Sequence, residues 1–385
     1  MNQVTPPASF IALAMQHAER AEWPVARALL EYATKIPRDS QSARLLLWEV
    51  CQVLGDPEAG VAHLRAAVTE TPLTFRAATH PCRRVLVINV VGDFQANLPV
   101  AMLLDNTTTD LHTLWMQPNV PVPDVLPEID CVFIAIAEDQ RHAAVLQAAD
   151  QLATKLGVPL INPGHLIAAT SRDQIAALLR DIPNTIVPNQ TLLMAQNLLS
   201  SAEFPLIIRP RHSHAGNGLA RIDNATALAA YLQPFQPAEP FFIAPFIDYR
   251  STDGAWRKYR IIFVDGHPMP FHMAIHDDWA VWYYNAGMDR DADKRAEEHA
   301  FLNDFSRVFP PRAIHALREI ATRVGLAYFG LDCGLMPDGT LVVFEVETGM
   351  IVHDRPEGEL FAYRQAPSRR ILAAVTALID ARIAG

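Results

Sequence analysis

Residues 328–354 read YFGLDCGLMPDGTLVVFEVETGMIVHD, and this stretch decides the fold of the second half of the chain. The dipeptide Asp338-Gly339 lies between two apolar runs, which is a strong signal for a two-residue β-hairpin loop. Pairing the strands outward from such a loop places Asp332 directly opposite Glu345. The sequence therefore predicts a hairpin with acidic side chains at matched positions of its two strands.

Three carboxylates are expected on one face of this hairpin. Side chains alternate between the faces of a strand, so Glu345 and Glu347 point the same way, and Asp332 joins them across the pair. Like charges on paired strands repel unless a cation lies among them. Carboxylate oxygens suit Mg²⁺, most readily when a phosphate shares the ion. The alternative is a solvated face with three acids that bind nothing, and a bulge at the turn would break the register.

Composition bounds the classes of protein that fit. The chain has 385 residues, of which 50% are hydrophobic and 19% charged, enough for two or three globular domains. The net charge of -10 argues against a general nucleic-acid-binding protein. No apolar run reaches the length of a membrane span, and the first residues lack a basic region followed by an apolar one. We expect a cytoplasmic protein with neither nucleic-acid nor membrane partners. The cysteines, expected to be reduced core thiols, are Cys51, Cys82, Cys131 and Cys333.

Residues 9–72 carry helical periodicity throughout. Trp23-Pro24 and Asp56-Pro57 occupy matching places between helices, so the pattern recurs after about 34 residues, the tetratricopeptide period. We predict a tetratricopeptide-like helical domain over residues 1–78, which serves recognition or assembly and is dispensable for nucleotide binding. The alternative is a plain four-helix cap on the domain that follows.

After a linker at residues 79–84, strands alternate with helices, which predicts an open α/β domain over residues 83–183. Its strands are expected at residues 85–91, 111–116, 131–137 and 158–161, and its helices at residues 138–156 and 162–179.

The remaining residues, 184–385, form a third predicted domain. A strand at residues 206–208 ends on Arg209, and the flexible, donor-rich loop 212–218 follows it. Such a loop can fold its backbone N–H groups over phosphates, although a plain hairpin turn also fits. Further strands are expected at residues 219–222, 241–246 and 257–264, an aromatic connection carries His272, Trp279, Trp282 and Tyr284, and helices are expected at residues 291–309, 312–324 and 371–383.

This order of parts resembles the ATP-grasp superfamily, in particular the branch of glutathione synthetase and the ribosomal-protein glutamate ligases. The resemblance covers residues 85–383 and rests on the strand ending in Arg209, the small-residue loop, the strand carrying Arg260, and the Asp…Glu-x-Glu hairpin. It implies an α/β (α+β) fold: an ATP-grasp domain preceded by an open α/β pre-ATP-grasp domain, with the all-α tetratricopeptide-like region outside it.

The resemblance also implies the residues of the site. Arg209 and Arg172 would contact the ATP phosphates, and Arg260, with Lys258 on the same strand, would act on the transferred phosphate and the substrate carboxylate. The Mg²⁺ ligands would be Asp332, Glu345 and Glu347. The remaining nucleotide-binding residues would be His212, Ser213, Gly216 and Gly218 over the phosphates, Pro245, Phe246 and Ile247 near the base, and Asp248 at the ribose.

Three departures from the family pattern stand out. Glu347 occupies a place where the family usually has asparagine, which adds negative charge near the metal. Arg172 and Arg209 stand where the family has lysines, which keeps the charge and gains a planar fork. The hinge reads Ala244-Pro245 and lacks the usual acidic residue.

The implied activity is ATP-dependent joining of a carboxylate to an amine through an acyl phosphate, on an amino acid, a small peptide or a natural-product precursor. One alternative is a peptide- or protein-modifying ligase recruited through the N-terminal helices. Another is a degenerate nucleotide-binding protein that recruits partners. His272 and His276 either lie near the acceptor or are structural, and a homodimer is left open.

Overall fold

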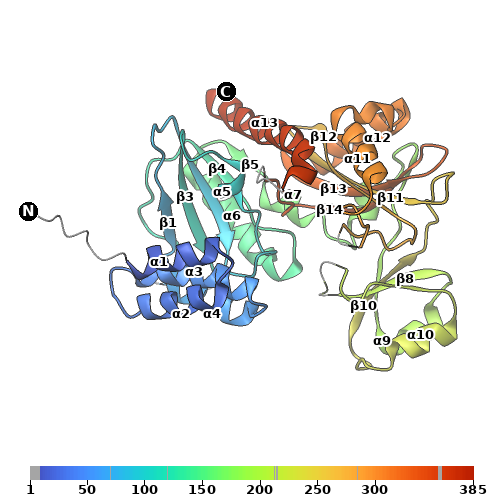
Figure 1. Cartoon of the computed structure of the whole chain (residues 1–385), viewed down its shortest axis with the longest axis horizontal. Helices are drawn as coiled ribbons and strands as arrows, with labels where there is room; N and C mark the ends of the chain where they lie inside the picture. Colours follow the sequence, from blue (N-terminus) through green and yellow to red (C-terminus); the bar gives the residue numbers. More distant parts are fainter. Residues whose placement is uncertain are drawn as a thin grey trace, which may run out of the picture. The chain divides into compact units, whose positions relative to one another are not determined.

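The computed structural model describes residues 9–69, 71–118, 120–211, 213, 216–283, 285–353 and 358–385. The chain divides into two compact units (Figure 1). One comprises Met1–His165 together with Ile379–Gly385, and the other comprises Leu166–Leu378. All residues assigned to the candidate site belong to the second unit.

The first unit begins with four helices, as predicted. They bury small and aliphatic side chains such as Ala26, Leu30 and Leu47 against one another. Two of them have a proline in the first turn, where the missing N–H would have no helical partner. The tetratricopeptide-like relationship stays a prediction. The helices are α1 (Phe10–Glu19), α2 (Trp23–Ala33), α3 (Ser40–Val53) and α4 (Pro57–Val68).

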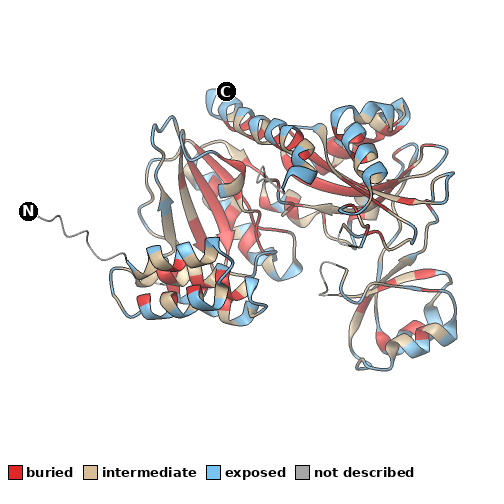
Figure 2. Ribbon diagram, viewed as in Figure 1, coloured by how far each residue is buried: buried red, intermediate tan, exposed pale blue. Residues whose placement is uncertain are grey.

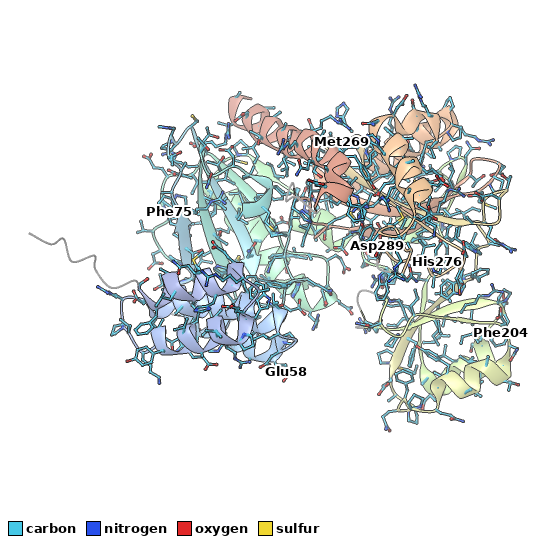
Figure 3. All side chains as sticks on the ribbon, in the orientation of Figure 1. Glu58, Phe75, Phe204, Met269, His276 and Asp289 are labelled. Carbon is cyan, nitrogen blue, oxygen red and sulfur yellow. The ribbon has the colours of Figure 1, made fainter. Side chains whose placement is uncertain are left out.

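A five-stranded sheet follows, in the order β1-β3-β2-β4-β5. The four strands β2 to β5 are parallel, as the apolar runs predict, and Figure 2 shows β2 and β4 largely buried. The edge strand β1, absent from the sequence prediction, pairs antiparallel with β3 and carries the exposed Phe75 (Figure 3). The strands are β1 (Leu73–Arg76), β2 (Arg83–Val90), β3 (Thr109–Met116), β4 (Cys131–Ile134) and β5 (Leu160–Ile161).

Helix α3 packs on this sheet. The indole Nε1 of Trp48 donates to the carbonyl of Gly92 at 2.9 Å, in the loop that follows β2. The Trp48 ring meets those of Phe94 and Trp115 edge-on, with centroids 5.3 and 5.7 Å apart. The helices and the sheet therefore share an apolar interface. The predicted helix at 138–156 is shorter, since a 3-10 turn (Gln140–His142) precedes α6 (Ala143–Leu156).

The second unit contains two sheets. The smaller has the order β7-β10-β8-β9 and is antiparallel throughout, with Leu198, Ile208 and Phe241 in its core. Its elements are β7 (Thr191–Met194), α9 (Ala195–Ser201), β8 (Leu206–Pro210), β9 (Ala220–Ile222), α10 (Ala225–Leu232) and β10 (Pro240–Pro245).

The larger sheet has the order β12-β11-β13-β14-β6 and carries the predicted acidic hairpin as β13 and β14. Strand β13 is buried along nearly its whole length (Figure 2). The strands are β6 (Thr185–Ile186), β11 (Trp256–Val264), β12 (His267–His276), β13 (Tyr328–Leu335) and β14 (Leu341–Glu347). Helices α11 (Ala292–Asn303) and α12 (Pro311–Val324) lie between β12 and β13 in the chain, and η3 (Glu359–Arg364) and α13 (Gln365–Ala384) follow β14.

Two sequence predictions in this unit are wrong in detail. His272, assigned to an aromatic connection, lies in β12, because strand pairing with β11 extends to His276. The single helix predicted over residues 162–179 is broken into α7 (Gly164–Ala168) and α8 (Ile175–Leu178), with a turn around Arg172 between them.

The hairpin reaches the predicted register by a different route. Its loop has three residues instead of two, since Met336 N donates to Thr340 O at 2.9 Å, and Gly339 has a φ of 80°. That extra residue shifts the pairing by one, and a bulge between the Cys333 and Asp332 pairs shifts it back. Asp332 therefore lies opposite Glu345, as predicted, because two irregularities cancel.

The predicted α/β fold class with N-terminal helices is confirmed. All four cysteines are free thiols, but Cys82 is exposed, so only Cys51, Cys131 and Cys333 are core residues. Among the described residues, no helix combines the length and apolar character needed to cross a bilayer. The predicted domain boundaries near residues 78 and 183 stay predictions.

Candidate active site

Four polar side chains form a row across the larger sheet. His272 on β12 pairs with Arg260 on β11, Arg260 pairs with Asp332 on β13, and Asp332 pairs with Glu345 on β14. Directly paired residues point to the same face of a sheet, so these side chains are neighbours. The row takes one residue from each of four strands in two hairpins, and the pairing of β11 with β13 brings the two hairpins together.

Asp332 is fully buried and bonded to two cations. The guanidinium of Arg260 donates to both carboxylate oxygens, with Nε–Oδ1 at 2.8 Å and a terminal nitrogen 3.0 Å from Oδ2. Lys258 Nζ lies 2.7 Å from Oδ2. Burial by itself would raise the pKa of Asp332, but Arg260 and Lys258 outweigh it and hold that pKa well below its ordinary value. Asp332 is therefore ionised at neutral pH.

Glu345 is bonded to Arg172 from the turn between α7 and α8. A terminal guanidinium nitrogen of Arg172 lies 2.6 Å from Oε2. Burial raises the pKa of Glu345, whereas Arg172 and Lys258 lower it, and the net shift is downward despite the repulsion from Asp332. The structure thus brings Arg172, 173 residues away in sequence, to the predicted metal ligand.

Glu347 differs from the other two acids. Burial and the neighbouring charge of Glu345 raise its pKa, although the backbone N–H of Gly349 donates to Oε1 at 2.8 Å and the charges of Arg172 and Arg260 act in the opposite direction. Across the residues that the structure describes, no three His, Cys, Asp or Glu side chains converge on a common metal position. In this structure Asp332 is bonded to Arg260 and Lys258, and Glu345 is bonded to Arg172.

Arg209 lies near the end of β8, as predicted, and is half-buried. Its Nε lies 3.3 Å from Ser213 Oγ, and a terminal nitrogen donates to the Ser213 carbonyl. Burial and Arg172 lower its pKa to about 10, with Glu345 acting in the opposite direction. The guanidinium therefore stays charged at neutral pH. The charges of both Arg172 and Glu345 act on its pKa.

The loop after β8 requires glycine at two positions. Gly216 and Gly218 have φ of 74° and 68°, in the left-handed region that other residues rarely adopt. A Cβ on Gly216 would lie 3.1 Å from the Trp282 ring, and one on Gly218 would lie 2.7 Å from Pro210. The loop backbone is thus tightly confined where it is described; His212 lies outside the described residues.

The residues assigned to the base and the ribose lie after β10. The backbone N–H of Phe246 donates to the Pro205 carbonyl at 3.1 Å, and its ring contacts Arg221 at 4.0 Å. Asp248 is bonded to Arg250, with separations of 2.5 to 3.1 Å. The neighbouring residues Pro245 and Ile247 have apolar side chains, so any role in base binding would be through backbone and shape.

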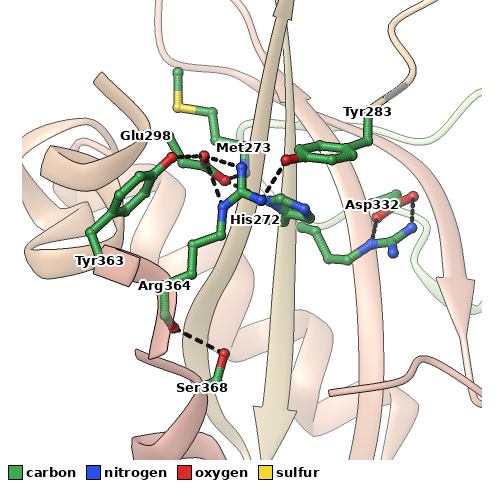
Figure 4. A network of polar contacts seen from close by, with 9 residues as sticks. His272, Met273, Tyr283, Glu298, Asp332, Tyr363, Arg364 and Ser368 are labelled. Atoms are coloured by element: carbon green, nitrogen blue, oxygen red, sulfur yellow. Dashed lines mark hydrogen bonds and ion pairs between the residues drawn. The ribbon is translucent and has the colours of Figure 1, made fainter. Parts of the chain in front are cut away.

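Sequence reasoning missed a buried polar cluster that surrounds His272 (Figure 4). Its centre is Glu298 on α11, which is fully buried and accepts from His272 Nδ1 at 2.6 Å. Arg364 and Tyr363 from η3 donate to the other oxygen of Glu298, at 2.6 and 2.5 Å. The sequence carried no signal for this cluster, because a glutamate in a helix rich in charged residues normally faces water.

Comparisons with known proteins fall into two groups. No protein-family model matches the chain, and no curated protein sequence matches it. Several solved structures are similar. The VanG D-Ala:D-Ser ligase from Enterococcus faecalis is 12% identical, with 77% of this chain and 99% of that chain covered and a TM-score of 0.48. A RimK domain ATP-grasp protein from Sphaerobacter thermophilus is 15% identical, with 78% and 100% covered and a TM-score of 0.43. The ATP-grasp ligase PsnB, in complex with a phosphomimetic variant of its minimal precursor, Mg and ADP, is 12% identical, with 76% and 98% covered and a TM-score of 0.44.

Proposed function

We propose that this protein is an ATP-grasp enzyme that joins a carboxylate to an amine, with release of ADP and phosphate. The observation that carries the proposal is the row of charges in the second unit, in which Arg260, Asp332 and Glu345 lie on three paired strands. Arg172 is bonded to Glu345 in this row, and the charges of Arg172 and Glu345 both act on the pKa of Arg209. Carboxylates interleaved with arginines and a lysine are what a Mg²⁺–triphosphate complex needs.

The chemistry of the donor set suits Mg²⁺ and ATP, although the three described acids do not converge on one position in this structure. Asp332, Glu345 and Glu347 would supply hard oxygen ligands from adjacent strands. Neighbouring Arg or Lys charges act to lower the pKa of each of these acids. Mg²⁺ on these oxygens would neutralise phosphate charge. The arginine and lysine side chains that now bond to the carboxylates are the groups that would then bind phosphate oxygens.

The residues of this chain would act mainly by positioning and charge. Arg209 and Arg172 would bind the phosphates that ADP retains, and the loop with Gly216 and Gly218 would cover them through backbone N–H groups. Arg260 and Lys258 would orient the substrate carboxylate toward the terminal phosphate and stabilise its charge during transfer. The segment from Pro245 to Asp248 would hold the nucleoside.

The second step would be attack of the amine on the acyl phosphate. Phosphorylation is needed because a free carboxylate is a poor electrophile. Amino acids or short peptides are the expected acids and amines, and PsnB, which was solved with a precursor peptide and AMPPNP, is an example of a similar structure with a peptide bound.

A screen for substrate-dependent ADP release tests the proposal. The common amino acids and a set of short peptides would be offered with Mg·ATP, singly and in pairs, and ADP would be measured by a coupled assay. We expect at least one acid–amine pair to stimulate ADP release in the native chain. Absence of ATP binding by calorimetry would contradict the proposal.

A further inference from the structure

Glu298 is the most completely bonded carboxylate in the described part of the second unit. One oxygen accepts from His272 Nδ1 and, at 3.3 Å, from the backbone N–H of Met273. The other accepts from Tyr363 and from two nitrogens of Arg364. Burial raises the pKa of Glu298, but His272 and Arg364 outweigh it, and the net shift is downward. Glu298 is therefore a carboxylate that can only accept hydrogen bonds.

This carboxylate decides the tautomer of His272. Because Glu298 only accepts, the proton of a neutral His272 must lie on Nδ1, which leaves Nε2 with a lone pair. Within the described residues, Nε2 makes no hydrogen bond, and the His272 side chain is 20% exposed. The ring packs on Tyr283 with a centroid separation of 4.4 Å. The imidazole is thus held by Glu298 and Tyr283, and its Nε2 is an unused proton acceptor.

The place of His272 connects it to the row of charges. It is the direct strand partner of Arg260, the residue assigned to the transferred phosphate and the substrate carboxylate. Paired side chains lie about 5 Å apart at Cβ. An amine that attacks an acyl phosphate beside Arg260 would therefore approach the same face of the sheet as His272.

We propose that His272 is the base that removes a proton from the acceptor amine, and that Glu298 and Arg364 are positioning residues that hold it in the required tautomer. This inference rests on the proposed ligase function. Arg364 donates to Glu298 at 2.6 Å and to the Tyr283 hydroxyl at 2.5 Å. It therefore fixes the positions of the two groups that contact the imidazole.

The proposed step is balanced as follows. The nitrogen lone pair of the amine attacks the acyl carbon, the C–N bond forms, and the bond from that carbon to the phosphate oxygen breaks. The electron pair of the broken bond leaves with phosphate, and a proton of the amine moves to Nε2 of His272. The resulting imidazolium, stabilised by Glu298, returns the proton to water.

The charges around His272 support a neutral ring. Burial lowers its pKa below the ordinary 6.5, Glu298 raises it, and Arg364 and Arg260 lower it further. These groups come from α11, η3 and β11, the elements packed against the ring, and Tyr283 adds its neutral hydroxyl. A neutral imidazole at physiological pH is the form that accepts a proton.

Nuclear magnetic resonance of the full chain, labelled with ¹⁵N in its histidine rings, tests the tautomer without any substrate. His272→Gln identifies the signals of His272. At pH 7 we expect a protonated Nδ1 and an unprotonated Nε2 in the native chain. In Glu298→Gln we expect a lower pKa of His272, because the carboxylate that raises it is gone. A proton on Nε2 in the native chain at pH 7 would overturn the assignment.

A second experiment separates acyl-phosphate formation from proton removal. The chain would be incubated with Mg·ATP and the pool of common amino acids, with and without hydroxylamine, which is neutral at pH 7 and needs no base. We expect His272→Gln to form hydroxamates at the native rate and to lose amide formation by about 100- to 10,000-fold. Glu298→Gln should move the pH profile of amide formation but not that of hydroxamate formation.

His267→Gln is the matched control. His267 begins the same strand, its side chain is exposed, and its Nδ1 lies 2.9 Å from the carbonyl oxygen of Asp265. We expect both reactions to be unchanged in that variant. Two results would overturn the assignment of His272 as the base. One is that His272→Gln retains amide formation, and the other is that it loses amide and hydroxamate formation equally. Absence of hydroxamate from the native chain counts against the ligase function instead, and the resonance experiment still decides the tautomer.

Discussion

Asp332 shows how a single buried carboxylate organises its surroundings. A fully buried charge is very costly unless partners bond to it, and Asp332 has both Arg260 and Lys258 within 3.0 Å. Mg²⁺ could replace these cations at the same oxygens without leaving the carboxylate unpaired. We expect such an exchange to release Arg260 and Lys258 for phosphate.

Glu345→Gln tests the acidic pair of the hairpin. The change removes the charge of a proposed Mg²⁺ ligand but keeps the size of a half-buried side chain, so we expect the thermal stability to change little. Substrate-dependent ADP release should fall by about 100-fold or more, because a neutral amide is a poor ligand for Mg²⁺. The control is Glu58→Gln, the same substitution at an exposed position of α4 in the other unit. Full ADP release in Glu345→Gln would remove the pair from the proposed site.

Arg209 is expected to bind phosphate through its charge. Arg209→Ala should weaken Mg·ATP binding by about 10- to 100-fold, the worth of a charged hydrogen bond, whereas Arg209→Lys should lose much less. Isothermal titration calorimetry measures both affinities, with Arg318→Ala on the exposed face of α12 as the matched control. Equal affinities for the Ala and Lys variants would mean that Arg209 does not touch phosphate.

The partly buried side chain of His272 predicts a pH dependence of stability. Its pKa in the folded chain lies below 6.5, so the unfolded chain binds a proton first as the pH falls. The contribution of neutral His272 to the free energy of unfolding is therefore complete above pH 6.5. It is lost as the pH falls from 6.5 toward the pKa of His272 in the folded chain. Urea unfolding midpoints measured between pH 8 and 5 should decrease more in the native chain than in His272→Gln. Parallel curves for the two chains would contradict this origin of the pH dependence.

At the scale of elements, the hairpin depends on close packing beside its carboxylates. Gly330 pairs with Glu347, and a Cβ on Gly330 would lie 2.1 Å from Sδ and 2.7 Å from Cβ of Met350. Met350 is almost fully buried, and its carbonyl accepts from the Tyr328 hydroxyl at 2.7 Å, which limits how far it can move. The segment after β14 is thereby held against β13.

Gly330→Ala tests this packing. We expect a loss of about 1–3 kcal/mol in stability, the usual cost of overpacking. Met350→Ala should lose stability through a cavity, and the double variant should lose less than the sum of the two, because the smaller residue at 350 makes room for the new methyl group. Denaturant midpoints of the native chain, the two single variants and the double variant complete the double-mutant cycle. Strictly additive losses would show that the two residues do not compete for space.

At the scale of the whole molecule, the helical segment and the proposed nucleotide site belong to different units. Helix α3 packs on the first sheet through Trp48, and β1 is an edge strand of that sheet. All residues proposed for nucleotide binding, from Arg172 to Glu347, lie in the other unit. The two parts should therefore respond differently to removal of the helices.

A chain that starts at Pro81 tests this separation. It lacks β1 and the cover over Trp115, so we expect the first sheet to lose stability. Affinity for Mg·ATP should stay close to that of the full chain. Trp48→Ala in the full chain is a less disruptive variant for comparison, since it keeps β1 and removes one contact with the loop after β2. A soluble, folded truncation that fails to bind ATP would contradict the separation.

Local pattern in the sequence was enough for much of the fold. Apolar runs such as residues 85–91 identified buried strands, and Asp338-Gly339 identified the hairpin, because both signals depend only on neighbours in the chain. The strand ending near Arg209 and the glycines after it were found in the same way. Prediction failed where pairing with a distant strand supplies the stability: β1 and most of β12 have no strong alternation of their own.

The tertiary structure alone decided which charges meet. Nothing local links Arg172 to Glu345, or Glu298 to His272 and Arg364, since each pair is joined by strand register and helix packing over many residues. The pairing of Asp332 with Glu345 was predicted from the sequence, but the folded chain reaches it by another route, because a bulge cancels an extra loop residue. The sequence by itself determined which side chains carry charge and which segments are strands. The folded chain determined their partners, because bonding and burial depend on distances that the sequence does not contain.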